Sequence, residues 1–152
     1  MHETLKVTPV LEDYLEAIYN LSRFDLCARS RDIAEALGVH KSTVTSALRA
    51  LKQLRLVNYS PYEAVTLTDE GRKVAKDVVK RHDTLKEFFT DVLEIEPEMA
   101  ETAACGMEHS MPREIVEKLA RFAENIRKYR KDRRTHDGGT GNAGRGKAGK
   151  KG

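Results

Sequence analysis

The chain has 152 residues, of which 39% are hydrophobic and 34% are charged. This size and composition are typical of one domain or of two small ones that share a core. No run approaches about 18 consecutive apolar residues, which argues against a membrane span, and the N-terminus lacks the features of a signal peptide. The two cysteines, Cys27 and Cys105, are too few for a disulfide framework. We therefore expect a cytoplasmic protein whose partners include neither a membrane nor an organic cofactor.

The charge is distributed unevenly along the chain. Residues 127–152 hold ten Lys/Arg against two Asp, whereas residues 1–126 hold seventeen Lys/Arg against twenty-two Asp/Glu. Seven of the ten glycines follow residue 137, so residues 131–152 are predicted to form a disordered, basic, glycine-rich tail. Such a tail could attract nucleic-acid phosphates without sequence specificity, or it could be solvated without a specific role. The composition leaves both interpretations open.

The first predicted helix covers residues 9–23. Thr8 is a suitable N-cap and Pro9 a suitable first helical residue. Leu11, Tyr14 and Ile18 then recur at helical spacing.

A helix-turn-helix follows this helix. Ser30 is a candidate N-cap for a short helix that Gly38 would end. A second helical pattern begins only a few residues later, and two short helices joined by a tight turn are typical of a helix-turn-helix. Strand-like alternation on both sides of Ser60–Pro61 adds a two-stranded wing. Residues 1–72 are therefore predicted to form a winged-helix DNA-binding domain.

The second half of the chain is predicted to be all helical. A long helix opens at Asp69, and Pro97 and Pro112 each begin another, with Ser110 as a candidate cap before the last. These helices carry more apolar surface than they can bury against one another, which favours a homodimer. The expected fold is mainly α: a winged helix-turn-helix, then an all-helical dimerisation domain over residues 73–130.

The second helix of a helix-turn-helix enters the major groove of DNA with its N-terminal residues. We expect double-stranded operator DNA to be contacted by its polar positions, which are His40, Lys41, Ser42, Thr43, Thr45, Ser46 and Arg49. A helical hairpin that binds only protein is the alternative. The acidic balance of residues 1–126 opposes constitutive DNA binding, and divalent cations bound by some of the carboxylates would reduce that opposition.

The segment "ACGMEHSM" at residues 104–111 holds three groups that can bind a metal. Cys105, Glu108 and His109 are three and four positions apart and would share one helix face. A fourth ligand must come from elsewhere, and the candidates are Asp13 and Glu16 of the first helix and His82 of the long helix. Taken singly, each residue could equally be a core cysteine, a solvated carboxylate or a hydrogen-bonded histidine, so spacing alone leaves the metal site open.

The chain resembles the diphtheria toxin repressor and manganese transport regulator family of metal-activated repressors. The resemblance is carried, in order, by "TPVLEDYLEAIY", "DIAEALGVHKSTVTSALRAL", "LTDEGRKVAKDVVKRH" and "CGMEHSM", and it covers roughly residues 8–125. It implies a winged-helix domain followed by a helical metal-binding and dimerisation domain, residues 73–130 of this chain. It also implies a primary metal site at Asp13, Cys105, Glu108 and His109, and a second site that includes Glu16 and His82.

The chain departs from both branches of that family. Iron-responding members tend to carry Met at the position of Asp13 with Cys at that of Cys105, whereas manganese-responding members keep the Asp and carry Glu in place of the Cys. Thiolate suits iron or zinc and carboxylates suit manganese or iron, so we rank Fe²⁺ first and Mn²⁺ second, while Zn²⁺, Co²⁺ or Ni²⁺ could substitute in vitro. At the second site, Lys86 replaces a glutamate of the iron branch, and Glu101 replaces an imidazole and is a further candidate ligand.

The hypothesis is a repressor in which a metal links the first helix to the dimerisation region and thereby favours DNA binding. One rival is a metal-independent winged-helix regulator that senses a small organic ligand. The other is a metalloenzyme, but we find no separate general base, substrate-binding loop or nucleophile motif such as G-x-S-x-G. We therefore expect that the protein is not an enzyme.

Overall fold

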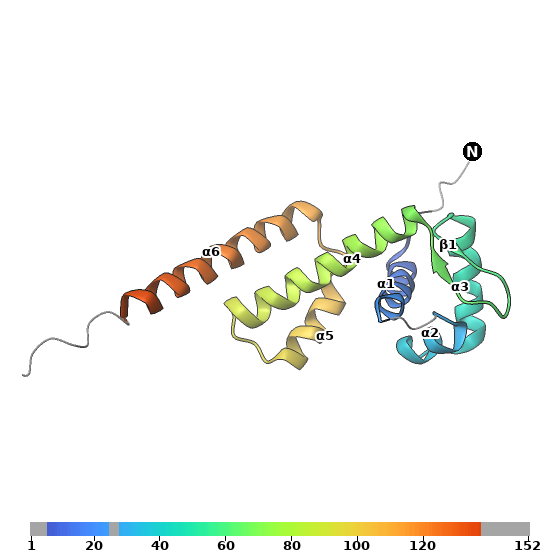
Figure 1. Ribbon diagram of the computed structural model, residues 1–152, viewed down its shortest axis with the longest axis horizontal. Helices are drawn as coiled ribbons and strands as arrows, with labels where there is room; N and C mark the ends of the chain where they lie inside the picture. Colours follow the sequence, from blue (N-terminus) through green and yellow to red (C-terminus); the bar gives the residue numbers. More distant parts are fainter. Residues whose placement is uncertain (1–5, 25–27, 138–152) are drawn as a thin grey trace, which may run out of the picture.

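The computed structural model describes residues 6–24 and 28–137. These residues form a mainly helical structure with a two-stranded antiparallel sheet, which confirms the predicted fold class (Figure 1). The elements in chain order are α1 (Pro9–Arg23), α2 (Ser30–Leu37), α3 (Lys41–Gln53), β1 (Val57–Asn58), β2 (Thr66–Leu67), α4 (Asp69–Glu87), the π-helical turn η1 (Phe88–Val92), α5 (Pro97–Met107) and α6 (Arg113–Asp137). Cys27 and residues 138–152 of the predicted tail lie outside the described residues.

The predicted start of α1 and the predicted end of α2 are confirmed. The Thr8 hydroxyl accepts a hydrogen bond from the Leu11 amide at 3.3 Å, and Pro9 is the first helical residue. Gly38 ends α2 in the left-handed region, at a φ of 64°. That conformation is one that glycine adopts without the steric cost of a Cβ.

Two predicted caps are wrong. Ser30 is the first helical residue of α2 and not its cap, because the preceding Arg29 already takes the extended cap conformation and its carbonyl accepts the Ile33 amide. Ser110 does not cap α6, since its hydroxyl donates back to the Met107 carbonyl at the end of α5. The α6 helix begins after Pro112, whose carbonyl accepts the first helical amides.

The wing is an antiparallel ribbon in which Val57 pairs with Leu67 and Asn58 with Thr66. An isolated bridge between Ala28 and Val65 joins it to the segment before α2. The connection between the strands holds the Ser60–Pro61 pair, as the sequence predicts, and its exposed tip faces away from the core.

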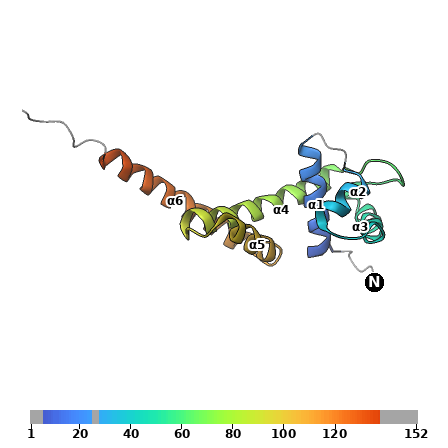
Figure 2. The same cartoon turned by 90° about the horizontal axis from the view of Figure 1, so that it is seen from below.

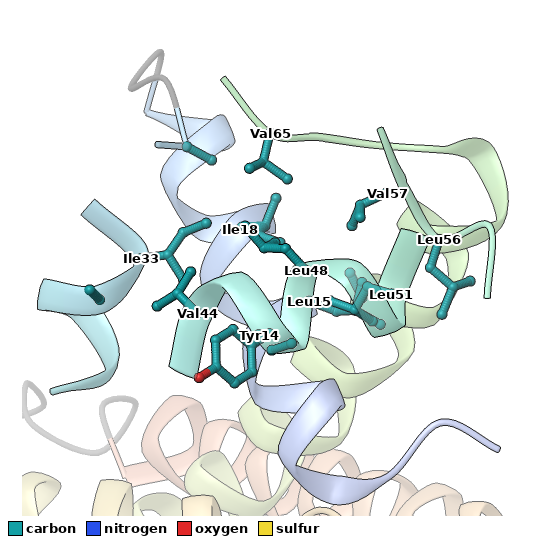
Figure 3. Packing of buried hydrophobic residues seen from close by; sticks show 14 residues of the cluster. Tyr14, Leu15, Ile18, Ile33, Val44, Leu48, Leu51, Leu56, Val57 and Val65 are labelled. Atoms are coloured by element: carbon teal, nitrogen blue, oxygen red, sulfur yellow. The ribbon is translucent and has the colours of Figure 1, made fainter. Parts of the chain in front are cut away.

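A contiguous apolar core lies between α1, α2, α3 and the wing (Figure 3). Its fully buried members include Leu15 and Ile18 of α1, Ile33 of α2 and Leu48 of α3. At the edge of this core α4 begins in contact with the chain that leaves α3: a Cβ on Gly71 would lie 1.8 Å from the Leu56 carbonyl oxygen. Only glycine permits that approach, so the start of α4 is held against the winged helix.

The helical half is packed differently. α4 crosses α1 and then lies against α5 and α6, and in both Figure 1 and Figure 2 α6 points away from α1–α3. The buried apolar residues that α5 and α6 contribute are small: Ala100, Ala104, Val116 and Ala123. The exposed ones are large, and they are Met99, Met107, Ile115, Phe122 and Tyr129.

Helix α6 continues through residues 131–137, which the sequence analysis assigned to the tail. The boundaries of the two domains stay a prediction. Over the described ranges, no helix combines the length and apolarity needed to cross a membrane.

Candidate metal centre and nucleic-acid interface

Three helices meet at the candidate metal centre. α1 supplies Asp13 and Glu16, α4 supplies His82, and α5 with the turn that follows it supplies Cys105, Glu108 and His109. Helix α5 ends at Met107, but Glu108 keeps helical backbone angles, with φ −56° and ψ −37°. The helical path of α5 therefore continues through Glu108, one residue past the formal end of the helix.

Glu108 is the centre of the cluster. It is fully buried, its Oε2 lies 2.5 Å from His82 Nδ1, and its Oε1 lies 3.3 Å from His109 Nε2. Oε1 nevertheless has no hydrogen-bond partner among the described residues. A buried carboxylate oxygen without a donor is costly, and a bound cation would remove that cost.

Two groups of potential ligand atoms converge on this carboxylate. Asp13, Glu108 and His109 form one group, and His82, Cys105 and Glu108 form the other; within each group the ligand atoms lie within 4.8 Å of one another. Oxygen, nitrogen and sulfur donors at these separations fit a first-row divalent ion. The residues present thus fit a metal, and the shared Glu108 joins the two groups.

Glu16 lies beside the cluster and outside both groups. Burial and the neighbouring Glu108 carboxylate raise the pKa of Glu16 to about 7. It lines, together with Asp13, His82 and Cys105, a cavity of about 490 Å³. The structure therefore places Glu16 next to the predicted primary site, where it would meet a cation that enters through the cavity.

The surroundings of the cluster raise the pKa values of three of its ligand groups. The hydrogen bond to Glu108 raises the pKa of His82 to about 9 in spite of burial. Partial burial and the neighbouring carboxylates raise the pKa of the Cys105 thiol to about 11. Burial lowers the pKa of His109, but its hydrogen bonds with Glu12 and Asp13 outweigh burial and the net shift is upward. A metal must displace these protons to bind.

Glu101 is engaged elsewhere. Its Oε1 lies 2.9 Å from His82 Nε2 and its Oε2 lies 2.6 Å from Lys86 Nζ. The hydrogen bond from Lys86 lowers the pKa of Glu101. The structure brings five of the seven candidates into the two ligand groups, places Glu16 beside them, and pairs Glu101 with a lysine.

Sequence reasoning missed two residues at this site, Glu12 and Arg81. Glu12 Oε2 accepts a hydrogen bond from Arg81 Nη2 at 2.7 Å and lies 3.1 Å from His109 Nδ1. Each is the chain neighbour of a candidate ligand, Asp13 or His82. Adjacency in sequence does not show that two side chains 69 positions apart will meet, so no pattern in the sequence could have identified the pair.

The candidate DNA-contacting residues of α3 face away from the core. His40, Lys41, Ser42, Thr43, Ser46 and Arg49 are exposed and Thr45 is half-buried. Lys41, Thr45 and Arg49 line a groove of about 500 Å³ between α3 and the wing, and the sequence analysis missed that Arg29, Arg31 and Tyr62 line it as well. Four cationic side chains along one groove suit a phosphate backbone.

Comparisons with known proteins match both halves of the chain. A family described as the iron dependent repressor, N-terminal DNA binding domain matches residues 6–65. A second, described as the iron dependent repressor, metal binding and dimerisation domain, matches residues 68–134.

Relatives in several organisms are similar over most of their length. An uncharacterised helix-turn-helix transcriptional regulator of Methanocaldococcus jannaschii is 35% identical over 118 residues, which are 77% of this chain and 94% of the relative. The helix-turn-helix transcriptional regulator MntR of Bacillus subtilis is 35% identical over 112 residues, 74% of this chain and 78% of that protein.

A solved structure of a manganese-dependent transcriptional repressor in complex with manganese superposes with a TM-score of 0.70 at 28% identity. The match covers 75% of this chain and 52% of that one, so the chain spans about half the length of this solved relative. The two matched domains together account for both halves of the chain: it belongs to the iron-dependent repressor family of transcriptional regulators, which are not enzymes.

Proposed function

We propose that this protein is a metal(II)-activated repressor that binds operator DNA as a homodimer, in the cytoplasm, and controls metal-ion homeostasis. The observation that supports it most directly is Glu108, a fully buried carboxylate with one oxygen lacking a hydrogen-bond donor and with ligand atoms converging on it. The groove between α3 and the wing supplies the surface for DNA.

Asp13, Cys105, Glu108 and His109 would hold the first ion. The ion would supply positive charge between carboxylates that otherwise repel one another, and its coordination would tie α1 to the end of α5. Glu16 and His82 are the candidates for a second ion. Glu101 would contribute to that second site only if its ion pair with Lys86 opened.

Fe²⁺ is the metal we rank first and Mn²⁺ second. The thiolate of Cys105 favours iron or zinc, whereas the carboxylates of Asp13 and Glu108 favour manganese or iron. Iron satisfies both kinds of ligand, and manganese is the metal bound by a solved relative. Zn²⁺, Co²⁺ and Ni²⁺ should occupy the same ligands in vitro.

Helix α1 couples the metal to DNA because it belongs to both halves. Leu15 and Ile18 of this helix are buried in the winged-helix core, while Asp13 Oδ1 lies 2.6 Å from His109 Nε2. Fixing α1 against α5 would fix the orientation of the two α3 helices of the dimer relative to successive major-groove half-sites. A coupling of about 1–3 kcal/mol would change DNA affinity 5- to 150-fold.

The test measures operator affinity across metal conditions. A duplex selected from a random pool in Mn²⁺ is titrated with protein in Fe²⁺, in Mn²⁺ and in chelator under anaerobic, reducing conditions. We expect binding at least fivefold tighter with metal, and loss of that difference in Glu108→Gln, which keeps the side-chain size. Glu70→Gln, on the exposed start of α4, is the control. Equal affinity in metal and in chelator would refute the switch.

A second candidate function is a metal-independent regulator that senses a small organic ligand. The observation in its favour is the apolar wall that Leu21, Phe24 and Leu37 give to the 490 Å³ cavity. This regulator would keep its DNA affinity in chelator and would tolerate Asp13→Ala combined with Glu108→Ala.

A further inference from the structure

Three nearly buried side chains form a connected chain beside the proposed ligands. The side chains of Arg81, Glu12 and His109 are only 13%, 15% and 13% exposed. Arg81 Nη2 lies 2.7 Å from Glu12 Oε2, and the same oxygen lies 3.1 Å from His109 Nδ1. Glu12 thus joins a guanidinium of α4 to an imidazole of the turn after α5.

The two nitrogens of the His109 ring face different surroundings. Nδ1 faces Glu12, whereas Nε2 lies 2.6 Å from Asp13 Oδ1 and 3.3 Å from Glu108 Oε1. A histidine that binds a metal through one nitrogen donates its other N–H to an acceptor, and that acceptor sets which nitrogen is free. Glu12 is the acceptor on the Nδ1 side.

Arg81 explains why Glu12 stays on that side. Its Nη1 donates to the Glu108 carbonyl at 2.9 Å, and its Nε lies 3.5 Å from Asp77. One guanidinium nitrogen therefore binds the residue that follows α5 while another binds Glu12. Glu12 is absent from both groups of converging ligand atoms among the described residues, although it is the chain neighbour of Asp13.

We propose that Glu12, anchored by Arg81, is a positioning residue that orients His109 so that Nδ1 donates to Glu12 and Nε2 binds the metal. The inference rests on the proposed function in one respect, which is that His109 is a ligand. Loss of such an outer partner typically lowers metal affinity 10- to 100-fold. Because Glu12 acts through His109, its loss should also change the chemistry of the ring nitrogens.

The experiment observes the ring directly. Protein labelled with ¹⁵N is titrated with Zn²⁺, which is diamagnetic, and the ring nitrogens of His109 are followed by long-range ¹H–¹⁵N correlation spectra. In the wild type we expect Zn²⁺ on Nε2 and a slowly exchanging proton on Nδ1. In Glu12→Leu we expect the slow Nδ1 proton to disappear and Zn²⁺ affinity, measured by competition with a chelator, to fall 10- to 100-fold.

Two further variants separate positioning from folding. Glu12→Gln keeps an oxygen that can accept a hydrogen bond from the Nδ1–H group. This variant should therefore retain Zn²⁺ on Nε2 and most of the Zn²⁺ affinity. Arg81→Met frees Glu12 and should weaken Zn²⁺ binding. Arg113→Met, which removes an arginine from an exposed pair with Glu117 on α6, is its control and should change nothing.

The outcomes distinguish the two proposals. Zn²⁺ on Nε2 with unchanged affinity in Glu12→Leu would overturn the positioning role and leave the proposed function standing, as would Zn²⁺ on Nδ1 in the wild type. A His109 ring whose signals do not change when Zn²⁺ is added would overturn both, because His109 would then not be a ligand.

Discussion

The two halves of this molecule bury their apolar side chains in different ways. The winged-helix half encloses large aliphatic residues, such as Leu15, Ile33 and Leu48, which are fully buried within one chain. In α5 and α6 the buried residues are mostly alanines, and large side chains such as Met99 and Phe122 remain exposed. The first half has a core of large aliphatic residues within a single copy, whereas the second offers a surface that a partner copy would cover.

The candidate metal centre lies where these halves meet, and it buries polar side chains where the two halves otherwise bury apolar ones. Glu108 and His82 are the buried charged or polar residues among those described. Buried carboxylate and imidazole groups do not contribute hydrophobic stabilisation, so their presence at the junction of α1, α4 and α5 indicates a role other than packing. A change that uncouples the halves should therefore differ from one that damages either of them.

The largest expected effect comes from Gly71→Ala, which strikes the junction itself. The added Cβ would lie 1.8 Å from the Leu56 carbonyl oxygen, and this contact is with backbone atoms that cannot rotate away. We expect a loss of more than about 4 kcal/mol in the free energy of unfolding, or failure to fold. Chemical denaturation followed by circular dichroism measures it, which suits a chain without tryptophan.

Gly106→Ala is the matched control for that change. Gly106 lies within α5 and a Cβ there would meet no atom within 4 Å. Alanine favours a helix by about 0.5–1 kcal/mol over glycine, so this variant should be slightly more stable. A Gly71→Ala protein as stable as the wild type would mean that α4 is not held against the winged helix.

How far the sequence predicts this molecule also differs between its halves. The winged helix follows from local signals, since Thr8, Pro9 and Gly38 mark helix ends and period-3.6 apolar residues mark the core face. Helix caps are less predictable: Ser30 and Ser110 have the right chemistry, but Arg29 takes the cap position of α2 and the Ser110 hydroxyl donates to the Met107 carbonyl.

The candidate site was predictable only where its residues share a helix face. Cys105, Glu108 and His109 are connected by spacing alone, whereas the meeting of His109 with Asp13, 96 positions away, required the resemblance to a family. Glu12 and Arg81 carry no local signal that separates them from ordinary surface charges. Long-range pairing of this kind depends on how α1 packs across α4, which periodicity does not encode.

The next effect tests the completeness of the winged-helix core. Leu48→Ala removes a fully buried side chain and should lower the free energy of unfolding by about 3 kcal/mol, the transfer free energy plus the cavity left behind. Leu93→Ala is the same substitution at a residue that is 53% exposed, and it should change stability by less than about 0.5 kcal/mol. Similar losses from both would contradict the comparison between the halves.

A third prediction concerns pH and the metal-free junction. The pKa of His82 is raised to about 9 from its ordinary 6.5, so its stabilising contribution is complete below about pH 6.5 and is lost as pH rises towards 9. The pKa of Glu16 is raised to about 7 from 4.5, so the folded state keeps this proton to a higher pH than the unfolded state does. The free energy of unfolding therefore falls as pH rises from 4.5 to 7. Both effects have the same sign.

Unfolding in urea with excess chelator, at pH 6, 7.5 and 9, measures this dependence. We expect the free energy of unfolding to fall by about 2 kcal/mol across that range. In His82→Gln the slope above pH 6.5 should flatten, because the titrating group is gone. A free energy of unfolding that rises with pH would show that other groups dominate the junction.

The smallest expected effect tests the incompleteness of the helical half. Phe122 is 52% exposed on α6, and the centroid of its ring lies 6.2 Å from that of Phe88. Phe122→Ser should weaken the proposed homodimer by about 1–2 kcal/mol. That change is roughly 5- to 30-fold in the dissociation constant, which sedimentation measures. Phe24 is even more exposed, at 74%, but it belongs to the winged-helix half, so Phe24→Ser should leave the dissociation constant unchanged. If exposure alone decided the effect, Phe24→Ser would weaken the dimer more than Phe122→Ser. If Phe24→Ser weakened the dimer and Phe122→Ser did not, the partner copy would have to cover the winged-helix half, and the surface on α6 would need a different occupant.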